Sequence, residues 1–203
     1  MLGQHGRGAI KAVFTPIARA LVKAGVSPDA VTITGTIAAS VAALALIAPG
    51  YLIAGSLTVG IIVFTDSLDG TMARLIGRDS PWGSFLDATL DRITDGAIFA
   101  AITIYLAGVP GSIGRWGLYA GIAAAILGSV VPYARARAEA SGYQASVGIA
   151  ERSDRLLIAL LATLLVGCGL PTWILPVALT YLAVAAAITI GQRLATVYQQ
   201  ARP

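Results

Sequence analysis

The chain has 203 residues, of which 57% are hydrophobic and 12% are charged, and its mean hydropathy is +0.80. Soluble globular domains carry roughly 25% charged residues, so this composition excludes an ordinary soluble domain and a disordered chain. The single cysteine, Cys168, cannot form an internal disulfide, which excludes a disulfide scaffold. At about 20 apolar residues per crossing, the length suits one membrane domain, residues 1–203, with about six membrane helices.

The first expected element is an amphipathic helix over residues 8–23. Its apolar residues recur at helical spacing along one arc, and its cations lie on the opposite side. This pattern is typical of a helix that lies in the cytoplasmic interface of a membrane, just before the first span. An ordinary helical tail is the alternative.

Six apolar segments follow, and we expect each to be a transmembrane helix because backbone amides in hydrocarbon must bond within their own segment. The expected spans cover residues 29–49, 51–76, 81–107, 116–140, 153–170 and 173–194. Ser27-Pro28 and Ser80-Pro81 each place a capping hydroxyl ahead of a proline that can begin a helix. The predicted fold class is an all-α integral membrane protein with six transmembrane helices, preceded by the cytoplasmic interfacial helix.

The positions of lysine and arginine predict the orientation of these spans. Twelve of the 14 cations fall on one side of the six expected helices, while Arg115 falls in a loop on the other side and Arg92 lies within the third span. Cations favour the cytoplasmic side, so we expect both termini to face the cytoplasm in a multi-pass protein of the plasma membrane. No nucleic-acid partner is expected.

Four carboxylates lie within the second and third spans, where each charge costs at least ~2.5 kcal/mol unless it is neutralised. Asp66 and Asp69 are three residues apart, and Asp87 and Asp91 are four apart, so each pair shares a helix face. In an antiparallel hairpin that turns near Arg78, the two pairs lie at matching heights. Four carboxylates at two levels suit hard divalent cations, so we predict a site for two bridged Mg²⁺ ions, with Mn²⁺ as the alternative metal.

Neighbouring residues indicate a phosphate-bearing substrate at this site. Gly70 and Gly83 leave backbone open to a close ligand, and Arg74 offers a forked donor to a phosphate. Together with the acids they describe a metal-bridged diphosphate. Arg92 and Asp95, farther along the third span, are expected to pair in a structural role.

Two alternative functions fit the acids less well. An ion carrier would scatter its acids over the membrane depth, and a structural lipid-binding protein would not require the spacing of the four aspartates.

These residues also carry a family resemblance. The run Asp66-Ser-Leu-Asp-Gly-Thr-Met-Ala-Arg74, followed by Gly83, Asp87 and Asp91 at fixed gaps, resembles the complete signature of the CDP-alcohol phosphotransferase family. The resemblance implies a six-helix membrane fold, usually a homodimer, with two divalent ions held by the four aspartates. It also implies Asp91 as the catalytic general base. A hydroxyl would attack the β-phosphorus of a CDP-linked lipid, and CMP would leave.

The same resemblance implies which residues bind the lipid nucleotide, CDP-diacylglycerol. They are Asp29, Ala30, Val31, Thr32, Gly70, Arg74 and Ser80. Asp29 and Thr32 stand one turn apart at the cytoplasmic start of the first span, which suits this role. Simple capping of the helix N-terminus is the alternative for these two residues.

An arginine cluster near the expected mouth of the site bears on the acceptor alcohol. Arg135, Arg137, Arg152 and Arg155 gather there, and Arg193 ends the last span at the same level. Arginine is the natural ligand of a phosphomonoester, so a phosphorylated acceptor is favoured. Anchoring of lipid headgroups is the alternative.

Residues 133–142 and the run 151–155 are similar to the corresponding segments of actinobacterial phosphatidylinositol phosphate synthases. This likeness implies 1D-myo-inositol 3-phosphate as the acceptor and phosphatidylinositol phosphate and CMP as products. It implies Arg135, Arg137, Arg155 and Arg193 as the inositol-phosphate ligands. Glycerol 3-phosphate, the acceptor of a phosphatidylglycerophosphate synthase, is the alternative.

Overall fold

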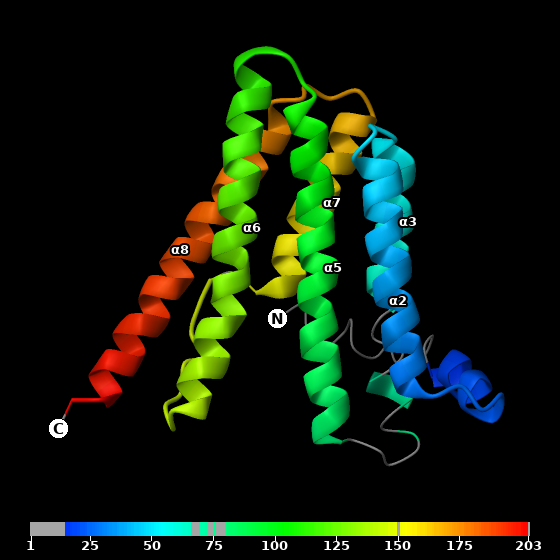
Figure 1. Ribbon diagram of the computed structural model, residues 1–203, viewed down its shortest axis with the longest axis vertical. Helices are drawn as coiled ribbons and strands as arrows, with labels where there is room; N and C mark the ends of the chain where they lie inside the picture. Colours follow the sequence, from blue (N-terminus) through cyan, green and yellow to red (C-terminus); the bar gives the residue numbers. More distant parts are fainter. Residues whose placement is uncertain (1–14, 66–69, 73–74, 76–79, 150, 203) are drawn as a thin grey trace. The chain divides into compact units, whose positions relative to one another are not determined.

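The computed structural model describes residues 15–65, 70–72, 75, 80–149 and 151–202. Within this part of the chain the structure is helical and contains no β-strand (Figure 1), which confirms the all-α prediction. Residues 15–23 are helical, while residues 8–14 of the expected amphipathic helix lie outside the described part. The labelled helices are α2 (Pro28–Ala42), continued by the π-helix η1 (Ala43–Ile47), α3 (Leu52–Thr65), α5 (Pro81–Ala107), α6 (Gly111–Ala140), α7 (Arg152–Gly167) and α8 (Ile174–Gln200).

Four helical stretches of the described chain are long and apolar enough to cross a bilayer. They are Pro28–Ile47, Leu52–Met72, which runs across the undescribed residues 66–69, Gly111–Ala140 and Ile174–Gln200. Helix α7 has 16 residues and is shorter than a usual crossing. Helix α5 has 27 residues, but any 18 consecutive ones include Asp91, Arg92 and Asp95. These two helices therefore differ from ordinary lipid-facing spans, and the count of six remains a prediction.

The serine caps predicted at two helix starts are present. The Ser27 hydroxyl accepts a hydrogen bond from the Ala30 amide at 3.2 Å, and the Ser80 hydroxyl accepts one from the Gly83 amide at 3.0 Å. Each cap satisfies one of the amides that a first helical turn leaves without an intrahelical acceptor. Helices α2 and α5 accordingly begin at the prolines that follow.

Two helices extend beyond the residues expected to span the membrane. Helix α6 begins at Gly111 rather than near residue 116, because Pro110 is extended and acts as the N-cap, and Arg115 is compatible with a helical turn. Helix α8 continues to Gln200 rather than ending near residue 194. Its last turns are polar but contain good helix formers, so the end of the apolar run does not mark the end of the helix.

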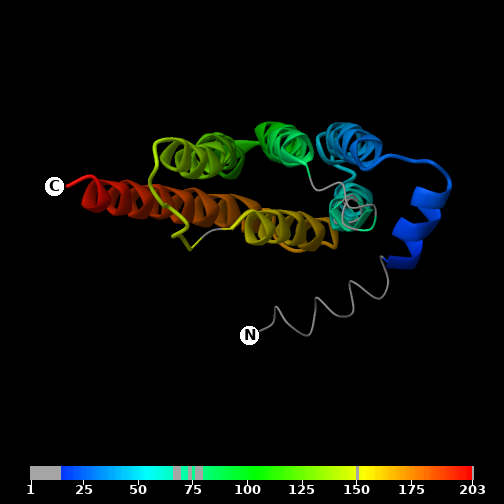
Figure 2. The same cartoon turned by 90° about the horizontal axis from the view of Figure 1, so that it is seen from below.

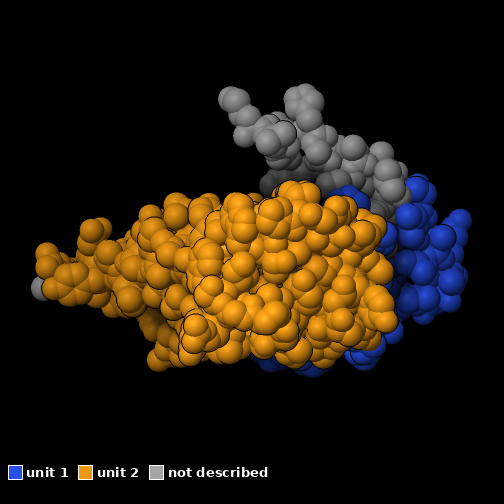
Figure 3. Space-filling view, turned by 90° about the horizontal axis from the view of Figure 1, so that it is seen from above, with its two compact units in different colours: residues 1–41, 58–94 blue, residues 42–57, 95–203 orange. Residues whose placement is uncertain are grey.

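The chain divides into two compact units, coloured separately in Figure 3. Unit 1 comprises residues 1–41 and 58–94. Its described core centres on Ala18 and Met72, both fully buried. The partly buried side chains packed on them are Leu21, Val22, Val26 and Val31. This core joins the N-terminal helical segment to the start of α2.

Unit 2 comprises residues 42–57 and 95–203, and within it α8 packs along α6 and α7 (Figure 2). Glycines on α6 allow the end of α5 to approach closely. A Cβ at Gly117 would lie 2.9 Å from Leu106, and one at Gly121 would lie 2.2 Å from the Thr103 hydroxyl. Small residues at helical spacing therefore set the distance between these two helices, as they do in many membrane bundles.

The segment between α6 and α7 contains a strap, residues 144–149, that is bonded along α8 at three points. The Gln144 amide and carbonyl bond the Gln200 side chain at 2.9 and 2.6 Å. The Val147 carbonyl accepts from Arg193 Nε at 2.9 Å, and the Ile149 amide donates to Thr189 Oγ1 at 3.3 Å. The strap therefore runs antiparallel to α8.

Candidate active site

The predicted metal ligands fall partly within the described residues. Asp66 and Asp69 lie outside them. Asp87 and Asp91 lie one turn apart on the same face of α5, where Asp87 is exposed and the Asp91 side chain is 15% exposed. Asp91 Oδ2 lies 3.7 Å from Arg92 Nη2. Among the described residues no three potential ligands meet as a complete metal site.

The donor atoms of the described residues in the acidic motif suit a hard cation. Both α5 ligands are carboxylates, the donors that Mg²⁺ and Mn²⁺ prefer over sulfur or imidazole. Two like charges one turn apart on a helix repel each other. A bound divalent cation would turn this repulsion into attraction, so the pair suits half of a cation site.

The first turn of α2 shows a contact that the sequence did not predict. The Trp82 indole Nε1 donates a hydrogen bond to Asp29 Oδ2 at 3.1 Å, joining the first turns of α5 and α2 within unit 1. Thr32 Oγ1 donates to the Pro28 carbonyl at 3.2 Å. The capping oxygen at this helix start belongs to Ser27, and Asp29 is the acidic residue of the first turn. No spacing rule links residues 53 positions apart, so only the tertiary structure reveals this pair.

Arg155, in the first turn of α7, is buried within unit 2, with its side chain 3% exposed. Its Nη1 donates to the Gly128 carbonyl at 2.9 Å. Pro132, four residues after Gly128 in α6, has no amide hydrogen, so this carbonyl lacks its usual helical donor. A Cβ at Gly128 would lie 1.9 Å from Arg155 Nη2. The proline leaves a carbonyl free to accept a hydrogen bond, and the glycine leaves the space that the guanidinium occupies.

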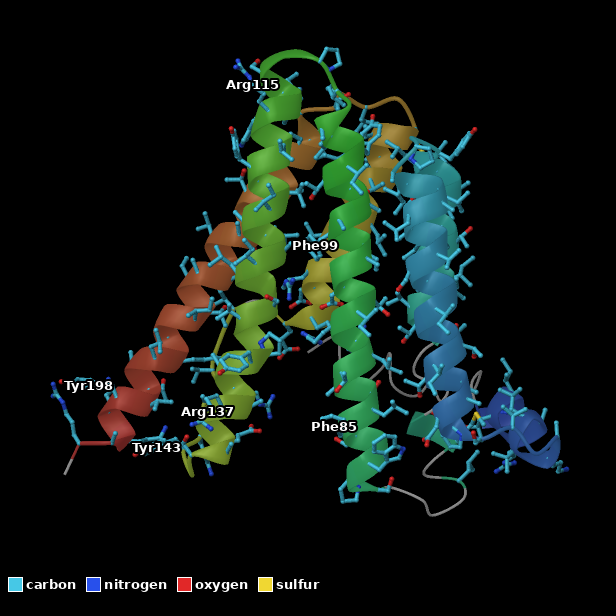
Figure 4. All side chains as sticks on the ribbon, viewed as in Figure 1. Phe85, Phe99, Arg115, Arg137, Tyr143 and Tyr198 are labelled. Atoms are coloured by element: carbon cyan, nitrogen blue, oxygen red, sulfur yellow. The ribbon has the colours of Figure 1, made fainter. Side chains whose placement is uncertain are left out.

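One buried carboxylate faces two arginines of α7. Asp95 Oδ1 lies 3.1 Å from Arg152 Nε, and Asp95 Oδ2 lies 4.0 Å from Arg155 Nη1. The Arg155 guanidinium carbon also stands 5.2 Å from the centre of the Phe99 ring, which Figure 4 labels on α5. Ion pairs thus join Asp95 to Arg152 and Arg155, and Asp91 to Arg92.

Arg193, predicted as an acceptor ligand, is attached to backbone oxygens of unit 2. Its Nε bonds the Val147 carbonyl of the strap, and its Nη1 bonds the Val131 carbonyl of α6. Arg193 also lies within electrostatic range of Arg135 and Glu139. These contacts bring Arg193 and Arg135 to the same end of the helices α6 and α8.

The remaining arginines of the predicted cluster are exposed. Arg135 forms an ion pair at 2.8 Å with Glu139, one turn later on α6. Arg137 lies at the end of α6 opposite Arg115 (Figure 4) and is exposed. Arg135 and Arg137 are two positions apart on α6 and therefore do not share a helix face. Among the described residues no hydrogen bond or ion pair joins Arg137 to Arg155 or Arg193, so its role stays a prediction.

A family model and curated relatives match most of the chain. The family model described as CDP-alcohol phosphatidyltransferase matches residues 25–198. The chain belongs to that family. It is 46% identical over 201 residues to the phosphatidylinositol phosphate synthase of Cutibacterium acnes, covering 96% of each chain. It is 41% identical over 194 residues to that of Mycobacteroides abscessus, covering 96% of this chain and 87% of the relative.

Solved structures of a family member share the fold. A crystal structure of Mycobacterium tuberculosis phosphatidylinositol phosphate synthase with CDP-DAG bound superimposes with a TM-score of 0.86 at 40% identity, covering 92% of this chain and 94% of that one. The same enzyme in complex with manganese and citrate gives a TM-score of 0.86 at 41% identity, covering 91% and 88%. The apolar helices and the family together identify this phosphatidyltransferase as an integral membrane protein.

Proposed function

We propose that the protein transfers the phosphatidyl group of CDP-diacylglycerol to inositol 3-phosphate, giving phosphatidylinositol phosphate and CMP. The observation that carries this proposal is the aspartate signature from Asp66 to Asp91, inside a family match that spans most of the chain. The relatives named above are phosphatidylinositol phosphate synthases, and the solved relative was crystallised with the same lipid nucleotide.

Asp66, Asp69, Asp87 and Asp91 would hold two divalent cations, which we propose to be Mg²⁺. The carboxylate-only donor set and the manganese complex of the tuberculosis enzyme support a hard divalent cation. When bound, such ions polarise the diphosphate and stabilise the charge of the departing CMP. The protein's task is then to place the two substrates in line, since phosphoryl-type transfer depends on alignment and electrostatics more than on covalent help.

The CDP-diacylglycerol site is proposed to comprise the α2 start with Asp29, Ala30, Val31 and Thr32, together with Gly70, Arg74 and Ser80. The Trp82–Asp29 hydrogen bond supports this placement, because it holds the Asp29 carboxylate at the first turn of α5, next to Ser80 and Gly83. Arg74 would donate its forked N–H groups to the diphosphate. Asp91 would accept the proton of the attacking hydroxyl.

The acceptor phosphate is proposed to bind Arg135, Arg137, Arg155 and Arg193. The hydrogen bond of Arg155 to the Gly128 carbonyl and the attachment of Arg193 to two carbonyls support this role for these two residues, because pre-oriented guanidinium groups lose little entropy on binding a phosphate. Exposed Arg135 and Arg137 would complete the charge around the ligand.

We further propose that residues 1–203 form one domain in the plasma membrane, with six spans, both termini and the site on the cytoplasmic side, and residues 8–23 in the interface. The distribution of cations and the apolar segments support this topology. A homodimer is proposed from the family resemblance.

The experiment is a transfer assay with the purified protein in detergent, CDP-diacylglycerol and Mg²⁺. Inositol 3-phosphate, glycerol 3-phosphate and unphosphorylated inositol are each offered as acceptor, and CMP and the lipid product are measured. We expect efficient transfer to inositol 3-phosphate alone, loss of activity with a chelator, and recovery with Mg²⁺ or Mn²⁺. Preferential transfer to glycerol 3-phosphate would assign the alternative acceptor, and cation flux without any transfer would support an ion carrier.

A further inference from the structure

Asp95 is a buried carboxylate that lies outside the aspartate signature. It follows Asp91 by four residues in the chain, and its side chain is 9% exposed in unit 2. An ionised carboxylate in such surroundings is costly unless it is paired and hydrogen-bonded. Asp95 meets this requirement through Arg152, at 3.1 Å, and Arg155, at 4.0 Å.

The two oxygens of Asp95 face different arginines, so this single carboxylate relates the two guanidinium groups to each other. Oδ1 faces Arg152 Nε, and Oδ2 faces Arg155 Nη1. Both arginines lie in the first turn of α7, whereas Asp95 belongs to α5. The carboxylate therefore links the start of one helix to the middle of another, through a charge-assisted hydrogen bond to Arg152 and an ion pair with Arg155.

Three groups limit the freedom of the Arg155 guanidinium. The Phe99 ring at 5.2 Å confines the position of its cationic carbon. The Gly128 carbonyl at 2.9 Å and the Asp95 carboxylate both lie on the Nη1 side. Because a guanidinium is planar and its donors form a rigid fork, fixing one side also sets the directions of the donors on the other side.

We propose that Asp95 is a positioning residue for the acceptor alcohol. It holds Arg155, with Arg152 as the second cation, in the orientation that binds the acceptor phosphate, and it does not itself touch the substrate. The inference deepens the proposed function, since it rests on the assignment of Arg155 to the acceptor site. It differs from a purely structural role because it links Asp95 to the affinity for one of the two substrates.

The test is two-substrate kinetics of the full-length enzyme carrying Asp95→Asn, with inositol 3-phosphate and CDP-diacylglycerol varied in turn. We expect the KM for inositol 3-phosphate to rise about 10-fold, while kcat and the KM for CDP-diacylglycerol change less than about 2-fold, because one ligand's orientation is lost. Asp154→Asn is the matched control. It makes the same chemical change at an exposed carboxylate in the same first turn of α7, and we expect no change in either KM.

A double-variant comparison shows whether Asp95 acts through Arg155. In an Arg155→Gln background, the added Asp95→Asn change should alter the KM for inositol 3-phosphate less than about 2-fold, because no guanidinium remains to be oriented. The doubly changed protein also buries no unpaired charge at this position. An independent 10-fold effect of Asp95→Asn in that background would overturn the proposal.

Asp95→Asn alone leaves Arg155 without its buried counter-ion and can lower the yield of folded protein. Arg152→Gln then carries the test, because the Arg152 side chain is 27% exposed and Asp95 keeps Arg155 as a partner. We expect about a 3-fold rise in the KM for inositol 3-phosphate, absent in the Asp95→Asn, Arg155→Gln background. An unchanged KM, or equal losses for both substrates, would overturn the proposal.

The wild-type enzyme separates the two levels of inference. If it does not transfer to inositol 3-phosphate, the proposed function fails. If it does, and Asp95→Asn folds with an unchanged KM for this acceptor, only the positioning role of Asp95 fails.

Discussion

The acidic region at the start of α5 and the basic region at the start of α7 differ in how their charged side chains are surrounded. Asp87 and Asp91 lie on one helix face, and among the described residues no measured ion pair involves Asp87. Arg155, in contrast, contacts a backbone carbonyl, an aromatic ring and the Asp95 carboxylate. The two acids are like charges on one face, of which Asp91 also pairs with Arg92 at 3.7 Å, whereas the arginine is held by three groups of the protein.

This difference indicates which kind of ligand each region is suited to bind. Like charges at close range are stable only when a cation joins them, so an acidic set gains its order from the metal. An anion site benefits from guanidinium groups that are already oriented, since ordering them during binding would cost entropy. The first region should therefore depend on an added ion, and the second on the integrity of the protein around it.

The largest expected effect is in the acidic region. Asp87→Asn should lower the rate of CMP release by about 1,000-fold or more, since the loss of metal-assisted charge stabilisation costs several kcal/mol in the transition state. The thermal unfolding temperature in the absence of metal should stay the same or rise, because one of two repelling charges is removed. CMP release and unfolding are measured on the same preparation, and undiminished turnover would contradict the metal assignment.

The basic region should respond in substrate affinity. Arg155→Ala should raise the KM for inositol 3-phosphate roughly 10- to 100-fold, as expected for loss of a charged hydrogen-bond donor, with little change in the KM for CDP-diacylglycerol. Arg135→Ala, at an exposed position where the guanidinium pairs with exposed Glu139, should have a smaller effect. Initial rates with each substrate varied test both variants, and an equal loss for the two substrates would indicate that Arg155 serves structure alone.

A substitution in α6 tests the close approach of Arg155 to Gly128. Gly128→Ala places a Cβ 1.9 Å from Arg155 Nη2, so we expect a loss of about 1–3 kcal/mol in the free energy of unfolding and a raised KM for the acceptor. Gly60→Ala is the matched control, because its Cβ would meet no atom within 4 Å and alanine favours a helix. Equal unfolding stability of the two variants would show that the close approach at Gly128 is unimportant.

The smallest effect is expected at the Trp82–Asp29 contact. Trp82→Phe removes one exposed hydrogen bond, so the KM for CDP-diacylglycerol should rise only about 2- to 5-fold. Trp116→Phe loses a comparable bond, 3.0 Å long, to Thr180, near the start of α6 and at the opposite end of that helix from Arg135 and Arg137, and should leave both KM values unchanged. If the two variants behave alike, the Asp29 contact does not serve the nucleotide site.

The sequence predicted best those features that depend on neighbours in the chain. Ser80-Pro81 marked the start of α5, because a serine cap and a helix-starting proline act within one turn. The continuation of α8 to Gln200 escaped prediction because apolar runs report membrane crossings, whereas polar residues prolong a helix equally well. The acidic motif was recognisable because its four aspartates have fixed spacing in the sequence.

The contacts that hold the arginines of the basic region were not predictable in the same way. Asp95 and Arg152 are 57 positions apart, and nothing in a single sequence favours this pair over a pair of Asp95 with nearby Arg92. The carbonyl of Gly128 is a partial exception. Pro132 in a long apolar helix implies an unbonded carbonyl four residues earlier, and a search for its donor among the arginines would have included Arg155.

The three-point attachment of residues 144–149 to α8 has a consequence for length variation among relatives. Because the attachments follow one another in antiparallel order, this stretch has a register, like a strand in a ladder. Inserting or deleting one residue between Gln144 and Ile149 would misalign at least one attachment, including the carbonyl that Arg193 bonds. We therefore expect insertions in this connection to fall before Gln144 or after Ile149, a distribution that an alignment of family members can check.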